Sequence, residues 1–410
     1  MNAQAATPAP PADGDSPEQP ERENRFAGAI REILSGTAII ALLSVLLAFF
    51  VGSLMILATD DRVRETAGYL TARPNDFLWA VRTCLTDAYG ALFRGAIWNT
   101  QADTFERQIR PLTESLKYAA PLILAGLGVG LTFRAGLFNI GGRGQMLFGG
   151  AAAGWVALSV DLPAVALVPL AVIAGAVAGG LWGGLAGLLK ARTGAHEVIV
   201  TIMLNYIAYY LLFYAVSTQG LLQSPGSTQA KSAAMPQEAR LPQVFGASFP
   251  AHSGIVLAVL AVVVVWWLLN KSAFGFRFRM VGENPAAARA SGVDVGRTYV
   301  TVMFLGGALV GLAGVNQVLG TVPDGVSPGL DAGIGFDAIT VALLGRSRPL
   351  GILAAGLLFG ALKAGGFLMA TAASIPVDIV LVIQALIVLF IAAPPLVRAI
   401  FRLPTKEARA

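Results

Sequence analysis

The segment HEVIVTIMLNYIAYYLLFY carries polar side chains at every fourth position: Glu197, Thr201, Asn205 and Tyr209. On a helix, this spacing places them on one slowly rotating face. Polar side chains inside a membrane helix are costly unless they contact protein or water. The face therefore either lines a hydrophilic path for a polar solute or joins neighbouring helices by hydrogen bonds.

Two further polar clusters accompany apolar segments. The stretch FRAGLFNIGGRGQ, residues 133–145, combines several glycines with Asn139 and Gln145. Its composition predicts irregular backbone at the membrane edge, which is tolerated only where protein or a water-filled cavity covers it. Asn316 and Gln317 form the third cluster, at the outer end of a later apolar segment.

The residues that catalysis or metal binding would require are scarce. The two histidines, His196 and His252, form no HExxH zinc motif, and no GxxxxGK[ST] phosphate loop occurs. Residues 325–329 match GxSxG, but no strand precedes them and Pro328 suits a turn. The single cysteine, Cys84, excludes an intrachain disulfide framework and indicates a packing residue. We predict no catalytic residue, no metal and no cofactor.

A charged island, residues 271–297, interrupts the apolar sequence. Within it, Asn284 suits a helix N-cap, Pro285 the first helical position and Gly292 the C′ position. A capped helix of about two turns on the basic side of a membrane is shaped to contact a cytoplasmic partner. The island's basic residues are Lys271, Arg277, Arg279, Arg289 and Arg297, and its acidic residues are Glu283 and Asp294.

The composition predicts an integral membrane protein with an all-α polytopic fold. Of 410 residues, 55% are apolar and 13% are charged, and the mean hydropathy is +0.68. Soluble domains have about 25% charged residues. We predict ten membrane spans, of which the eighth is short enough to be a half-helix or part of a re-entrant hairpin. The spans are residues 36–58, 113–133, 144–160, 163–189, 197–217, 254–270, 298–319, 336–345, 350–372 and 376–394.

Basic residues orient these spans, because lysine and arginine are retained on the cytoplasmic side. With the N-terminus inside, the inner segments contain Arg134 and Arg143, then Lys190 and Arg192, the island, and Arg346 and Arg348. The outer turns contain no Lys or Arg, but do contain Asp161, Asp324, Asp331 and Asp378. Both termini are therefore expected in the cytoplasm. This distribution explains the net charge of +5 better than nucleic-acid binding does.

Outside the spans, the sequence predicts tails and two outer loops around one transmembrane domain, residues 26–398. Residues 1–25 are rich in Pro, Ala and acidic residues, which predicts a disordered cytoplasmic tail and no signal peptide. Residues 59–112 contain a segment with helical apolar spacing, which either lies flat at the interface or packs on the outer ends of the spans. Residues 218–253 form a second outer loop, and residues 399–410 a cytoplasmic tail.

Four of these segments together resemble bacterial ABC importer permeases of the branch that serves simple sugars, branched-chain amino acids and nucleosides. The resemblance runs from about residue 113 to residue 395, and the pattern on the fifth span is most similar to nucleoside permeases. The N-terminal tail and residues 59–112 have no counterpart in it. The segments are FRAGLFNIGGRGQ, HEVIVTIMLNYIAYY, GENPAAARASGV and GFDAITVALLGRSRPLG.

The resemblance implies a permease subunit for nucleosides or related simple sugars in a bacterial cytoplasmic membrane, without an ATPase site of its own. In that family, permeases work in pairs with cytoplasmic ATPase subunits and an extracytoplasmic substrate-binding protein. The island's helix then resembles the element that couples to the ATPase, with Glu283, Asn284, Pro285, Arg289 and Gly292 as its key residues. The candidates for the substrate path are Asn139, Gln145, Thr201, Asn205, Tyr209 and Asn316.

Two alternatives remain open at this stage: a secondary transporter driven by an ion gradient, and a membrane-embedded enzyme. A secondary transporter commonly places ionisable residues in the middle of the membrane. Here the span centres are expected to hold almost none, because Glu197, Asp337 and Asp378 fall near span ends. The sequence does not fix the substrate. We expect a different paralogue, rather than a second copy, as the other permease.

Overall fold

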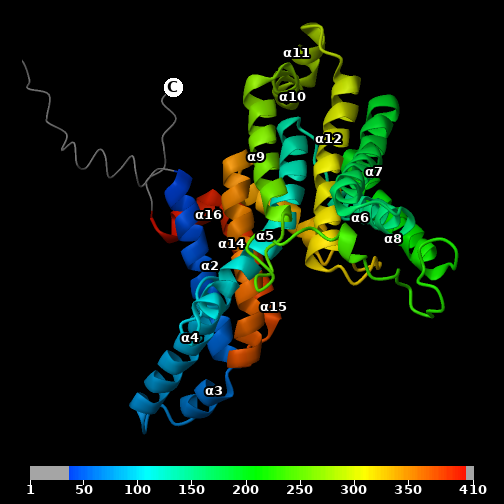
Figure 1. Cartoon of the computed structure of the whole chain (residues 1–410). Coiled ribbons are helices and arrows are strands. Elements are labelled where there is room, and N and C mark those ends of the chain that lie inside the picture. The colour runs from blue at the N-terminus through cyan, green and yellow to red at the C-terminus, as the bar shows by residue number, and fades with distance from the viewer. Residues whose placement is uncertain (1–36, 403–410) are drawn as a thin grey trace, which may run out of the picture.

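The structure, a computed structural model, describes residues 37–402 and is built there from helices (Figure 1). Within this range, β pairing is limited to one bridge, between Gln243 and His252. The predicted tail of residues 1–25 and residues 403–410 lie outside the described residues. The helices are α2 (Thr37–Thr59), α3 (Asp61–Ala67), α4 (Pro74–Ala96), α5 (Phe105–Arg134), α6 (Gly142–Ser159), α7 (Ala164–Thr193), α8 (Glu197–Ser217), η1 (Gln237–Ala239), α9 (Gly254–Lys271), α10 (Ala273–Glu283), α11 (Pro285–Ala290), α12 (Val295–Asn316), η2 (Gln317–Thr321), α13 (Ile334–Leu344), α14 (Pro349–Ala373), α15 (Val377–Ala392) and α16 (Pro394–Ile400).

Each of the ten predicted spans coincides with a helix, namely α2, α5 to α9 and α12 to α15. The all-α polytopic fold is therefore confirmed, although the count of ten is approximate. Seven described helices are long and apolar enough to cross a membrane, or eight if α15 and α16, bent by 94°, form one span. The 11 residues of α13 are too few to cross, because a span needs about 20.

Helices α5 to α8 and α12 to α15 form two units with matching packing. Each unit packs against the first helix of the other unit. Helix α7 of the first unit packs against α12 of the second, and α14 of the second unit packs against α5 of the first. Likewise α6 packs against α12, and α13 against α5. Both α6 and α13 follow an irregular segment, residues 135–141 and 322–333 respectively. Because α5 and α12 run antiparallel, with Gly128 beside Gly306 at their crossing, the units have the arrangement of inverted-topology repeats.

Glycines bring α6, α7 and α12 into backbone contact. A Cβ atom added at Gly311 of α12 would overlap the carbonyl oxygen of Gly175 and lie 3.0 Å from the Cα of Gly179. A Cβ added at Gly149 of α6 would in turn collide with the backbone of Gly311. Only glycine permits this close approach of three helices.

We expect Gly311→Ala to destabilise the folded protein by about 2 kcal/mol, because the methyl group must displace backbone atoms of α7. The measurement is the melting temperature in detergent. The control is Gly184→Ala on the same helix pair, where the nearest atom to the new Cβ is a Phe304 side-chain carbon at 3.6 Å. Equal melting temperatures for the two variants would contradict the packing argument.

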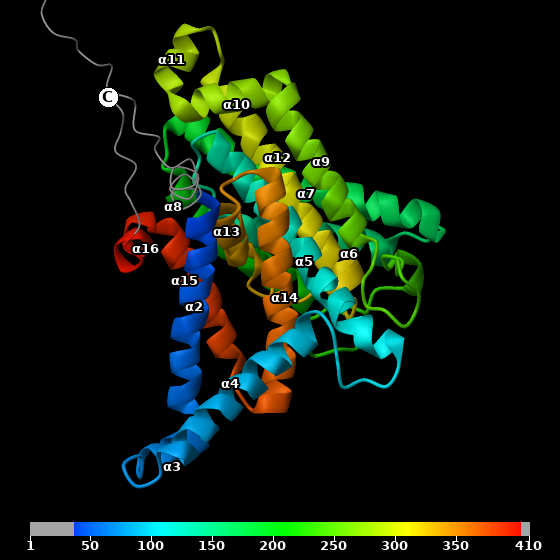
Figure 2. The ribbon, with the colours of Figure 1, turned by 90° about the vertical axis from the view of Figure 1, so that its left-hand side faces the viewer.

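The charged island forms the tip of one end of the bundle, as Figure 2 shows for α10 and α11. The side chain of Asn284 accepts hydrogen bonds from the backbone N–H groups of Ala286 and Ala287, and Pro285 is the first helical residue. Gly292 adopts a φ of 82°, in the left-handed region that favours glycine. The predicted helix and its capping residues are therefore confirmed.

Helices α3 and α4 lie at the opposite end of the bundle (Figure 2). One side of α4, including Cys84, Ala88 and Leu92, is buried, and α4 packs against α14, α2 and α5. Burial, followed by the nearby Asp60, raises the pKa of Cys84 to about 11, so this cysteine remains a neutral thiol. The first turns of α4 still expose large apolar side chains, such as Trp79 at 64%.

Candidate functional site

The N-termini of α6 and α13 meet inside the bundle. A Cβ atom added at Gly142, the first residue of α6, would lie 2.6 Å from the carbonyl oxygen of Gly335 in α13. A Cβ added at Gly335 would lie 2.5 Å from backbone atoms of Arg143. Both positions therefore require glycine. The free N–H groups at such helix ends favour polar and negatively charged groups.

This junction lies near the middle of the membrane span. The Nζ atom of Lys363 donates a hydrogen bond of 3.3 Å to the carbonyl oxygen of Ala332, two residues before α13 begins. Lys363 is the fifteenth of the 25 residues of α14. At 1.5 Å per residue, it lies about 21 Å from one end of this helix and about 15 Å from the other.

Four charged side chains gather at the junction. The Arg143 Nε lies 3.3 Å from the Asp331 Oδ1, with side-chain exposures of 30% and 6%, although the angle between them does not satisfy a hydrogen bond. The Arg143 guanidinium also lies over the ring of Tyr209, 5.0 Å from its centre. Asp337, in the first turn of α13, and Lys363 are close enough to interact electrostatically. Two positive and two negative charges make the junction neutral overall.

The position of this ion pair corrects two predictions. Arg143 was expected on the inner side and Asp331 on the outer side, yet they are paired at one depth. The reason is that residues 135–141 return into the bundle, so that α6 begins part-way across it. The expectation that span centres hold almost no ionisable residue is also wrong. Lys363 interrupts the apolar run of α14, and this lone lysine was the signal that could have found the site.

Two of the predicted path residues, Thr201 and Asn205, hold the segment that precedes α6. Asn205 Oδ1 accepts a hydrogen bond of 2.8 Å from the N–H of Gly144, and its Nδ2 donates one of 2.9 Å to the carbonyl oxygen of Ile140. Thr201 Oγ1 accepts a hydrogen bond of 3.3 Å from the N–H of Ile140. The polar face of α8 thereby fixes the backbone on both sides of Arg143.

The other path candidates lie at two places. Asn139 and Gln145 exchange two side-chain hydrogen bonds, of 3.3 and 3.2 Å, within the same buried cluster. Tyr209 lies at its edge, beneath Arg143. Asn316 is apart from them, at the outer end of α12, where it is fully buried and its amide has no hydrogen-bond partner among the described residues. A path-lining role for any of the six predicted residues remains a prediction.

We expect Asn205→Leu to impair transport about tenfold more than Met203→Leu, because two backbone groups beside Arg143 would lose their partner. Met203 is 51% exposed on the same helix and provides the control. The measurement is the initial rate of solute uptake at equal protein levels. Equal rates in the two variants would show that Asn205 joins neighbouring helices and has no further role in transport.

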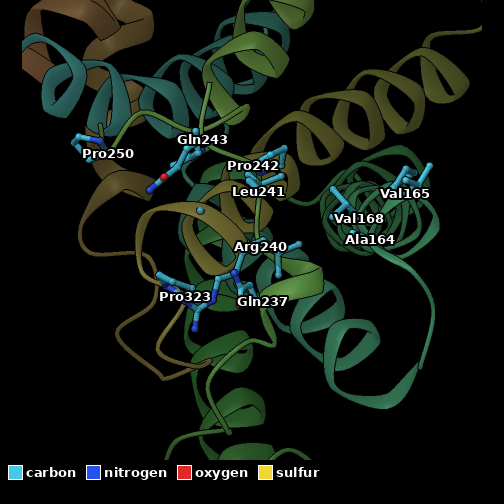
Figure 3. Close-up of a pocket in the computed structure, with 14 residues that line it drawn as sticks. Ala164, Val165, Val168, Gln237, Arg240, Leu241, Pro242, Gln243, Pro250 and Pro323 are labelled. Atoms are coloured by element: carbon cyan, nitrogen blue, oxygen red, sulfur yellow. The ribbon is translucent and has the colours of Figure 1, made fainter. Parts of the chain in front are cut away.

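The loop of residues 218–253 crosses the irregular segment that leads to Asp331. Met235 N–H donates to the carbonyl oxygen of Pro323, and Leu241 N–H to that of Leu319, each at 2.8 Å. A groove of about 830 Å³ opens between this loop and the beginning of α7 (Figure 3). Its walls are mostly valine, leucine and proline side chains, and the four charged residues of the junction do not line it.

His252, in this loop, predicts a pH dependence of stability. Burial, and then the nearby Lys117, lower the pKa of His252 from 6.5 to about 4. The unfolded chain therefore binds a proton below pH 6.5 that the folded chain does not bind until about pH 4. The contribution of His252 to the free energy of unfolding is therefore fully present above pH 6.5. This free energy falls by about 3 kcal/mol on acidification to pH 4. Between pH 6.5 and pH 4, the melting temperature of His252→Gln should therefore fall less steeply than that of the unmodified protein.

Comparisons with known proteins give a consistent result. The family model described as "Branched-chain amino acid transport system / permease component" matches residues 112–392. The guanosine ABC transporter permease NupP of Bacillus subtilis is 38% identical over 74% of this chain and 86% of its own length. The glucose ABC transporter permease TsgB13 of Haloferax volcanii is 38% identical over 74% and 80%. The nucleoside ABC transporter permease NupB of Lactococcus lactis is 36% identical over 69% and 79%. A second permease from each of these organisms matches at 26% to 30% identity.

Proposed function

The chain belongs to the family of branched-chain amino acid transport permeases, and from this premise we propose that it forms part of the membrane path of an ATP-driven importer for neutral nucleosides or simple sugars. It is a transport subunit rather than an enzyme. The three relatives serve guanosine, glucose and nucleosides by name. These solutes share many hydroxyl groups and carry no net charge at neutral pH.

The charged junction is the observation that carries the choice of solute. Arg143 and Lys363 supply hydrogen-bond donors, and Asp331 and Asp337 supply acceptors, at the depth where a path must cross the membrane. Because the four side-chain charges cancel, these side chains offer no net attraction to an anion or a cation. It suits a neutral solute with hydroxyl or ring-nitrogen groups. Phe336, which precedes Asp337 in α13 and is 50% exposed, adds an accessible aromatic side chain to this helix.

A second permease completes this path in our proposal. Lys363 and Asp337 are only partly buried at mid-span, and intramembrane charges are stable where they face protein or water. We infer that a related but different permease covers this face. The pairs of permeases found in three organisms, of which one member matches this chain more closely, favour a paralogue over a second copy.

The other partners follow from the same assignment. Helix α11 would contact a cytoplasmic ATPase subunit through Glu283 to Gly292, and the opposite end of the bundle would receive the substrate-binding protein. In this proposal, both termini lie in the cytoplasm and the chain lies in the cytoplasmic membrane of a bacterium. ATP hydrolysis, rather than an ion gradient, would then drive uptake.

Reconstitution tests this proposal. Proteoliposomes containing the chain, the second permease, the ATPase subunit and the binding protein should accumulate a radiolabelled nucleoside or glucose only when ATP is present. A protonophore should leave uptake unchanged while ATP is held constant. Uptake that continues without the ATPase subunit, or that stops with the protonophore, would favour a secondary transporter instead.

A further inference from the structure

A second groove opens at the outer end of α14. It has a volume of about 650 Å³ and lies between α14 and the connection from α4 to α5. Its floor includes Phe367 and Thr371 of α14. Its opposite wall includes Arg94 of α4, and Arg107 and Arg110 at the beginning of α5.

This groove and the charged junction lie along one face of α14. Lys363, Phe367 and Thr371 follow one another at intervals of four residues, so their side chains lie on the same helix face. The Phe367 ring lies 5.8 Å from the ring of Tyr118 in α5, centre to centre. An aromatic pair therefore separates the outer groove from the lysine at mid-span, one helical turn below it.

The arginines of the groove are available to a ligand. Within residues 37–402, the side chains of Arg94, Arg107 and Arg110 make no ion pair and donate no hydrogen bond. Each guanidinium carries five N–H donors. Asp103 and Asn99, in the same wall, supply acceptors. The groove thus combines donors, acceptors and an aromatic surface in a volume typical of small-molecule sites.

The three arginines also precede the part of the chain that matches the family. That match begins at residue 112, whereas α4 and the connection to α5 lie before it. The groove is therefore built on one side from α14, inside the range that the family model matches, and on the other mainly from residues that precede this range. A segment that faces the polar route is placed to alter which solute enters it.

We propose that this groove is a second binding site for the transported solute, at the outer mouth of the path, and that α4 with its connection to α5 confers part of the solute selectivity. The proposal rests on the proposed function. A neutral solute with hydroxyl groups and a flat ring would bind with its polar groups at Arg107 and Arg110 and its ring near Phe367. It would then move along α14 to Lys363.

Photolabelling tests the site directly. The complete complex of both permeases and the ATPase, in lipid nanodiscs and without the binding protein, is irradiated with 8-azidoadenosine, or with a photoreactive glucose if uptake selects the sugar. Label is expected in peptides spanning residues 94–114 and 364–371. The double variant Arg107→Ala/Arg110→Ala should reduce this labelling about tenfold. Arg82→Ala, an exposed arginine of α4 outside the groove, should leave it unchanged.

Three other outcomes would count against the proposal. Label confined to other peptides, or insensitive to the double variant, removes the site. If the double variant is labelled normally but no longer retains the binding protein when that protein is added in a separate binding assay, the arginines form a protein-docking surface and the selectivity role fails. A complex that transports neither nucleosides nor glucose contradicts the proposed function itself, whereas transport with label elsewhere contradicts this inference alone.

Discussion

Deletion of residues 284–292 is expected to reduce ATP-driven uptake to background while the protein still inserts into the membrane. The deletion removes α11, which forms the tip of its end of the bundle (Figure 2). Only Ala288 of this helix is buried, against Val281 and Val295, so the rest of the helix surface is free to contact a partner. Uptake and the amount of protein in the membrane fraction are measured together.

A matched pair of single substitutions sharpens this test. Arg289 and Arg192 are both exposed arginines, but only Arg289 belongs to α11. Arg289→Ala is expected to weaken co-purification of the ATPase subunit, whereas Arg192→Ala is not. If uptake survives the deletion at normal protein levels, α11 is not the coupling element.

Neutralising one member of the pair between Arg143 and Asp331 is expected to lower uptake at least a hundredfold. Arg143→Gln leaves the Asp331 carboxylate, 6% exposed, without its cationic partner. Breaking a buried pair from one side costs about 3 to 5 kcal/mol, so the melting temperature should fall as well. The exposed pair of Arg64 and Asp61 provides the control, because Arg64→Gln should change neither quantity.

The double variant Arg143→Gln/Asp331→Asn separates contact with solute from structural support. Removing both charges leaves no unpaired ion, so most of the lost stability should return. Uptake should nevertheless stay low, since the donors and acceptors for the solute have been weakened. Full recovery of uptake together with stability would show that the pair only holds α6 and α13 in place.

Local signals in the sequence were sufficient for some elements. The capping residues Asn284, Pro285 and Gly292 predicted α11 because each acts on the backbone within a few residues. Long apolar runs predicted α2, α5 to α9 and α12 to α15 for a similar reason, since a helix satisfies its backbone hydrogen bonds internally. The short length of the run at residues 336–345 also pointed to a half-helix, α13.

The charged junction could not be predicted in the same way. The depth of Arg143 depends on residues 135–141, which return into the bundle because Thr201 and Asn205 of a distant helix bond to their backbone. Counting basic residues in short loops treats such a segment as lying outside the membrane. The pairing of Arg143 with Asp331 requires two such segments to meet, and no spacing in the sequence records that meeting.

The correspondence between α5 to α8 and α12 to α15 has a consequence for how the protein could move. Each half presents equivalent parts to opposite compartments. If the two halves exchanged their slightly different conformations, an entrance closed on one side would become open on the other, with the meeting point of α6 and α13 as the pivot. A second conformation of the molecule can therefore be built by giving α5 to α8 the conformation of α12 to α15, and the reverse. Distances between spin labels on the two halves would test whether this second conformation occurs.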